Sequence, residues 1–138
     1  MCPDTITEEQ LIKIFTGIAS EGKYKDSHME WIKVSYAIIK TCELSGFENR
    51  AADLVDQFSQ LGTSGSYDAN AVQHLINGYK YEFPVDNPVS WLLQNYLPKQ
   101  SATRDEFLQN VTTQYYYKDY TKFAQQRVDL DDIREYCK

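Results

Sequence analysis

The feature that most constrains this chain is the spacing of its large apolar residues, which recur three and four positions apart between helix-start signals. The first set occupies positions i, i+3, i+4 and i+7 of one helical face: Leu11, Ile14, Phe15 and Ile18. Stretches that alternate apolar and polar residues, as half-buried strands do, are nearly absent. The pattern predicts an all-α fold, a compact helical bundle of about five to seven short helices.

Polar caps and turn residues predict where each helix begins or ends. The first helix begins with a capping box at Thr5–Glu8 or at Thr7–Gln10, and both alternatives stay open. The other start signals are Ser27–Glu30, Asn49 or a residue nearby, Asp68, Asp86 or Asn87 before Pro88, Thr103–Glu106 and Asp129. The stop signals are Gly46 and Pro98. The helix after Ser27 carries apolar residues on several stripes, so we expect it to be central and the most buried.

Burial and domain organisation follow from the same pattern. We expect the helix after Asn49 to bury Ala51, Leu54, Val55, Phe58 and Leu61. A chain of 138 residues is long enough for one real core. The only plausible boundary lies between Pro98 and Ser101. We therefore predict a helical core domain over residues 1–97 and a C-terminal helical extension over residues 98–138, packed on the core or continuing it.

Charge and cysteine usage narrow the class of protein. The net charge of −6 argues against binding nucleic acid over the whole surface, although a local basic patch is compatible with it. Three sparse cysteines form neither a disulfide framework nor a zinc-binding pattern. The N-terminus does not resemble a secretory leader, and no apolar run is long enough to span a bilayer. We expect an intracellular protein of the cytoplasm or nucleus, neither secreted nor embedded in a membrane.

Candidate catalytic and metal-binding residues are few. His28 and His74 have no Cys, Asp or Glu at a metal-binding helical spacing, and Cys42 falls within an apolar helix, as a core residue does. The sequence from Gly62 to Ser66 lacks the ending of a phosphate-binding loop and is typical of a flexible linker. We predict no catalytic residue, metal site or cofactor, and an enzyme is the least favoured function.

A segment near the C-terminus interleaves aromatic and basic side chains, a combination that can stack bases and hold phosphates. Its candidate nucleic-acid-binding residues are Tyr115, Tyr116, Lys118, Tyr120, Lys122 and Arg127. The simpler interpretation is an aromatic stripe that packs on the core beside solvated lysines, and a protein interface is a third. A second aromatic patch, predicted around Tyr79, Tyr81 and Phe83, favours a protein–protein adaptor whose acidic surface selects a basic partner.

Four short motifs between Leu11 and Tyr96 follow one another in a distinctive order. They are Trp31-x-x-Val34-Ser35-x-Ala37-Ile38, Phe58-Ser59, Tyr67-Asp68 and Ser90-Trp91-Leu92. This order resembles the type-2 primase C-terminal domain, a helical domain between the primase and superfamily-3 helicase parts of poxvirus-like and giant-virus primase–helicases. Ser35 stands where that family usually has Gly, and a Trp expected in the Tyr-Asp helix is replaced near His74 or Leu75.

The resemblance covers about two-thirds of the chain and carries no active-site residue over, because the chain has neither a primase carboxylate triad nor a helicase Walker motif. It implies a non-catalytic connector or accessory module of viral or mobile-element DNA replication. The expected partners are a primase or helicase, with contact to single-stranded or duplex DNA. The alternative is a protein–protein adaptor that binds no nucleic acid, and the oligomeric state stays open.

Overall fold

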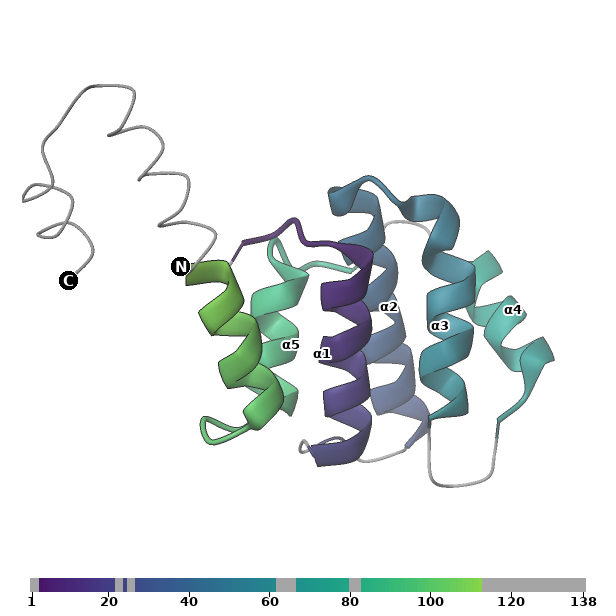
Figure 1. Ribbon diagram of the computed structural model, residues 1–138. Coiled ribbons are helices and arrows are strands. Elements are labelled where there is room, and N and C mark those ends of the chain that lie inside the picture. The colour runs from purple at the N-terminus through teal and green to yellow at the C-terminus, as the bar shows by residue number, and fades with distance from the viewer. Residues whose placement is uncertain (1–2, 22–23, 25–26, 62–66, 80–82, 113–138) are drawn as a thin grey trace, which may run out of the picture.

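A computed structural model describes residues 3–21, 24, 27–61, 67–79 and 83–112, and its regular elements there are all helical, as predicted. The elements are α1 (Glu8–Glu21), α2 (His28–Ser45), the 3₁₀ turn η1 (Glu48–Arg50), α3 (Ala51–Gln60), α4 (Ala69–Gly78), α5 (Pro88–Tyr96) and a last helix over residues 102–112. The bundle has α4 at one side and the 102–112 helix at the other (Figure 1). No described helix is both long and apolar enough to cross a membrane.

Helix α2 is the centre of the bundle, as its broad apolar surface predicted. It packs against α3, α5 and η1, and buries side chains on several of its faces. Ser27 caps its start by accepting a hydrogen bond from the Glu30 amide at 3.3 Å. Gly46 ends it with a φ of 85°, a left-handed conformation that glycine adopts without a steric penalty. The two local signals therefore set the length of the central helix.

The other caps are mostly those that the sequence predicted. Thr7 and Gln10 form a reciprocal capping box, with the Gln10 amide donating to Thr7 Oγ1 at 3.1 Å and the Thr7 amide donating to Gln10 Oε1 at 2.9 Å. The second alternative for the start of α1 is therefore correct. Asp68 caps α4, and Asn87 caps α5 with Pro88 in its first turn.

The 102–112 helix packs on α1 and begins with a different cap from the one predicted. Ser101 Oγ accepts from the Arg104 amide at 3.1 Å, so the proposed Thr103–Glu106 box is wrong. The reason is a long-range contact, because the carboxylate of Glu21 accepts hydrogen bonds from the Ser101 hydroxyl and the Thr103 amide. These two donors, the Ser101 hydroxyl first, lower the pKa of Glu21.

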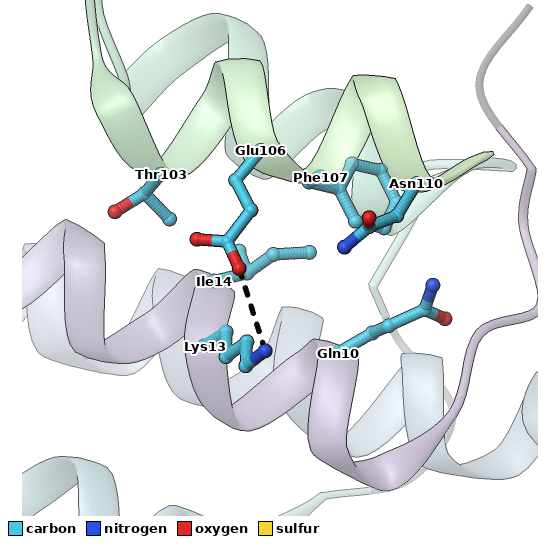
Figure 2. A pocket seen from close by; sticks show the side chains of 7 residues that line it. All are labelled: Gln10, Lys13, Ile14, Thr103, Glu106, Phe107 and Asn110. Atoms are coloured by element: carbon cyan, nitrogen blue, oxygen red, sulfur yellow. Dashed lines mark hydrogen bonds and ion pairs between the residues drawn. The ribbon is translucent and has the colours of Figure 1, made fainter. Parts of the chain in front are cut away.

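The interface between α1 and the 102–112 helix is nearly closed. Gly17 lies directly against Thr103, and a Cβ atom added to Gly17 would come within 2.4–2.7 Å of the threonine side chain. A cavity of about 20 Å³, room for roughly one water molecule, remains beside Ile14 and Phe107. Figure 2 shows its lining and the ion pair of Lys13 with Glu106, whose atoms lie 3.4 Å apart. The boundary proposed at residues 97 and 98 stays a prediction.

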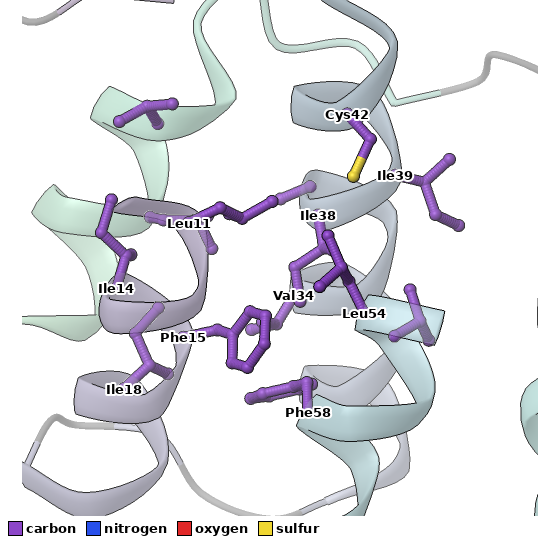
Figure 3. Packing of buried hydrophobic residues seen from close by; sticks show 14 of the residues in the cluster. Leu11, Ile14, Phe15, Ile18, Val34, Ile38, Ile39, Cys42, Leu54 and Phe58 are labelled. Carbon is purple, nitrogen blue, oxygen red and sulfur yellow. The ribbon is translucent and has the colours of Figure 1, made fainter. Parts of the chain in front are cut away.

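The hydrophobic core lies where α1, α2 and α3 meet (Figure 3). The four α1 residues predicted to share one face are all buried. Phe15 and Phe58 meet edge to face, with ring centroids 5.9 Å apart. Such a pair adds about 0.5–1.5 kcal/mol to the effect of burial alone. Leu61 is the exception among the residues predicted to be inward, because it lies just beyond the end of α3 and is 37% exposed.

The connector that leads into α5 is held by the central helix. Lys40 Nζ donates to the carbonyl oxygen of Phe83 at 2.9 Å and to that of Val85. Phe83 is buried, and its ring meets Trp91 edge to face with centroids 5.0 Å apart. The predicted exposed aromatic patch is therefore wrong at Phe83, because the lysine draws this connector against the bundle.

Candidate functional site

An open groove of about 230 Å³ lies between α2 and α4, on the side of the bundle far from the 102–112 helix. Both helices pack on α3 but scarcely contact each other, and this separation leaves the groove. Its lining residues come from the two helices at helical spacing: His28, Trp31, Ile32 and Tyr36 from α2, and Ala71, His74, Leu75 and Gly78 from α4. The groove therefore depends on the packing of helices that are distant from each other in the sequence.

Trp31 forms a rigid part of the wall. Its indole Nε1 donates to Ser59 Oγ at 2.8 Å, and the Ser59 hydroxyl in turn donates to the Val55 carbonyl at 2.7 Å. The His28 ring lies beside the indole, with ring centroids 5.7 Å apart. Ser59 and Val55 both belong to α3, so helix α3 orients the indole before any ligand arrives. The indole ring forms part of the groove.

Three polar side chains that line the groove have no hydrogen-bond partner within the described part of the chain. The imidazoles of His28 and His74 and the hydroxyl of Tyr36 form no hydrogen bond or ion pair with any described residue. The Tyr36 ring meets Tyr79 edge to face at 5.1 Å. An apolar surface with a few available donors and acceptors is the usual composition of a binding site.

Gly78 keeps one end of the groove open. An added Cβ atom would meet no atom within 4 Å, and the backbone there is not in the left-handed region. A Cβ atom added at this groove-lining position therefore meets open space. Near the other end, Met29 is 61% exposed and adds apolar surface one residue away from His28.

The electrostatics of the described surface are acidic. Of the described cationic side chains, only Lys99 lacks an acidic or carbonyl partner. Arg50, for example, donates to Glu8 at 3.0 Å and to Asp53 at 2.6 Å. Lysines and arginines that are already paired offer little to the phosphates of a nucleic acid, whereas the excess of carboxylates attracts basic groups.

The predicted nucleic-acid-binding residues lie outside the described residues, and so does Tyr81. They are Tyr115, Tyr116, Lys118, Tyr120, Lys122 and Arg127. The helix start predicted at Asp129 also lies outside the described residues. The prediction made for these residues stays a prediction.

Cys42, His28 and His74, which the sequence analysis considered for catalysis or metal binding, all lie in the described part of the chain. Cys42 is buried, and burial, followed by the charges of Glu8 and Glu43, raises the pKa of its thiol to about 12. In the described ranges, no three His, Cys, Asp or Glu side chains gather closely enough to hold a metal ion. His28 and His74, which the sequence places 46 positions apart, line the same groove. Sequence reasoning missed this pairing because no local signal joins α2 to α4.

The motifs that carry the family resemblance serve packing in the structure. Trp31 of the first motif bonds Ser59 of the second, and the Tyr67 hydroxyl of the third donates to Asp56 of α3. Ser35 is fully buried, and its hydroxyl has no hydrogen-bond partner among the described atoms. No model of a protein family matches the chain, and comparisons with curated proteins and with solved structures also found no match.

Proposed function

We propose that this chain is a non-catalytic module that binds a partner protein, and that the groove between α2 and α4 is its binding site. The observation that carries the proposal is the composition of the groove: an apolar floor, an indole oriented by Ser59, and two imidazoles and a phenol hydroxyl that form no hydrogen bond with a described residue. Interfaces concentrate their binding energy in aromatic anchors and desolvated pockets of this kind.

The size of the groove favours a protein over a small molecule. Sites for cofactors and drug-sized ligands usually enclose about 300–1,000 Å³ and bury most of the ligand. A groove of about 230 Å³ that is open to solvent suits a few side chains of a partner instead. The exposed Met29 beside it extends the apolar surface available to such a partner.

Two observations support a function without catalysis. The Cys42 thiol is buried with a pKa of about 12, so it is not available as a thiolate nucleophile near neutral pH. A histidine that acts as a general base is usually oriented by a neighbouring carboxylate. None of the residues that line the groove is an Asp or a Glu, so neither imidazole has such a partner among them.

A displayed library of random peptides, selected against the whole chain, tests this function. Binders should change the emission of Trp31 in a Trp91→Phe background, where Trp31 is the single tryptophan. They should also lose at least about tenfold in affinity on Gly78→Leu, which adds a large side chain at a residue that lines the groove. The matched control is Asn70→Leu, which adds the same side chain at an exposed α4 position outside the groove. Binders that ignore Gly78→Leu would place the binding site elsewhere.

A second candidate is an accessory module of viral or mobile-element DNA replication that joins a primase or helicase and contacts DNA. The direct contact of Trp31 with Ser59 favours it, because this bond joins two of the motifs that resemble the primase-associated domain. The described surface is acidic, so DNA contact would depend on Tyr115, Tyr116, Lys118, Tyr120, Lys122 and Arg127.

Fluorescence anisotropy of labelled single-stranded and duplex DNA over a salt series tests the second candidate. Saturable binding that weakens with salt and disappears when these six residues are changed to alanine is the expected result. Lys99→Ala is the control, since Lys99 is an exposed cation of the described part. Absence of binding at tens of micromolar protein would leave the protein-binding function alone.

A further inference from the structure

We propose that the occupant of the α2–α4 groove is one apolar face of an amphipathic α-helix whose ends carry lysine or arginine. The inference rests on the proposed function and specifies its partner. It follows from the shape of the groove, from the spacing of its lining residues and from the charges beyond its two ends.

The groove has the length and the walls of a helix-binding site. Its α2 residues run from His28 to Tyr36 and its α4 residues from Ala71 to Gly78, which is about 10–12 Å along each helix, or two turns. The contact of Tyr36 with Tyr79 places the end of α4 beside the middle of α2, so the two walls run in the same direction. Two such ridges form a trough into which a third helix can insert side chains at i, i+3, i+4 and i+7.

The lining also favours a helix over an extended strand. A strand would need unpaired backbone groups along the groove to continue a sheet, and here both walls are helices whose amides and carbonyls are bonded internally. The groups available for bonding are side chains: His28 and Tyr36, about two turns apart on one wall, and His74 on the other. The successive lining residues of each wall, by contrast, are about one turn apart, and aliphatic or aromatic anchors one turn apart on the occupant match that spacing.

Carboxylates beyond both ends of the groove set the charge of the partner. Asp68 caps α4 one turn before Ala71, and Asp56 accepts a hydrogen bond from the neighbouring Tyr67. Beyond the other end, Glu43 lies two turns after Tyr36 on the same face of α2. Basic side chains at each end of the occupant would therefore meet acidic groups, and the acidic described surface would speed their approach.

Two patterned peptide libraries with the same residues in different orders test the inference. One places apolar residues at i, i+3, i+4 and i+7, and the other alternates them as a strand would. Both leave the end positions free, and both are selected against the whole chain and measured with Trp31 emission in the Trp91→Phe background. The helical library should yield the binders, enriched in lysine and arginine at their ends, and Gly78→Leu should weaken them at least about tenfold while Asn70→Leu leaves them unchanged.

Variants that remove a carboxylate outside the groove test the basic ends of the occupant separately from the shape of the groove. Glu43→Gln should weaken a basic-ended helical peptide severalfold at low salt and less at high salt. Asp105→Asn, which removes one charge from the 102–112 helix at the opposite side of the bundle, should change binding less than Glu43→Gln does.

Some results would overturn only the helical, basic occupant, and others would overturn the protein-binding site as well. Groove binders from the alternating library alone, or binders with acidic ends, would overturn the helical, basic occupant and keep the protein-binding site. Self-association that Gly78→Leu abolishes would identify a second copy as the occupant and would also overturn it. No binder from either library, or only binders insensitive to Gly78→Leu, would overturn both.

Discussion

Gly17 and Gly78 occupy the same kind of position, a helix face turned toward a neighbouring helix, and their surroundings are opposite. At Gly17 an added Cβ would lie 2.4 Å from Thr103 Oγ1, whereas at Gly78 it would meet no atom within 4 Å. The missing side chain lets two helices close in the first case and keeps a groove open in the second. The same residue type therefore allows a close packing contact on one side of the bundle and lines an open groove on the other.

The largest effect should come from removing the side chain that anchors the closed side. Phe107→Ala should lower the free energy of unfolding by about 3–4 kcal/mol, because Phe107 is buried against α1 and leaves a cavity. Tyr36→Ala, on the open side, should cost about 1–2 kcal/mol because Tyr36 is only half-buried. Urea unfolding measures both. Equal losses would show that the two interfaces do not differ in packing.

The two glycines can be compared directly by adding one methyl group to each. Gly17→Ala should lower the free energy of unfolding by about 1–3 kcal/mol, since the clash with Thr103 outweighs the gain in helix propensity. Gly78→Ala should be neutral or stabilise by up to about 1 kcal/mol. Thr103→Gly should recover part of the loss in the Gly17→Ala background. A stable Gly17→Ala variant would contradict the close approach of the two helices.

The fixed wall of the groove gives the third effect. Trp31→Phe should cost about 1–2 kcal/mol, because it removes the hydrogen bond to Ser59 along with some apolar area. Ser59→Ala removes the same bond from the other partner. In a double-mutant cycle the second change should cost less than it does alone, and strict additivity would mean that the bond contributes nothing.

The smallest effect concerns the cap that joins α1 to the 102–112 helix. The pKa of Glu21 is lowered in the folded chain, so its contribution to stability is present above the unfolded value of about 4.3 and is lost as the pH falls through the folded value. Glu21→Gln should therefore cost less than about 1 kcal/mol at pH 7, because solvent screens an exposed carboxylate. The difference from the wild type should vanish toward pH 2, and a constant difference would exclude the ionised cap.

Local signals in the sequence predicted the helices well, and contacts between distant residues account for what they missed. Thr7–Gln10, Ser27, Gly46, Asp68 and Asn87 act within one turn of themselves, so their roles could be inferred from neighbours alone. The start of the 102–112 helix could not be, because Glu21 reaches it from the end of α1.

The candidate site was the least predictable part. It depends on how α3 holds α2 and α4 apart, which places His28 and His74 on opposite walls of one groove. Trp31, His28 and His74 were singled out from the sequence, but not as parts of one site, because the spacing of the groove residues on each helix is also that of ordinary core residues. Phe83 was misplaced for a similar reason, since the lysine that draws its connector inward is 43 residues away.

The bonds of Lys40 to the carbonyls of Phe83 and Val85 have a consequence for chemical labelling of the chain. An ammonium group whose protons are engaged must first release the connector before an amine-reactive reagent can modify it. Lys99, which is exposed and has no such partners in the described part, should react at the rate of a free amine. The ratio of the Lys40 labelling rate to the Lys99 labelling rate, measured by mass spectrometry, would then report how often the segment before α5 detaches from the central helix.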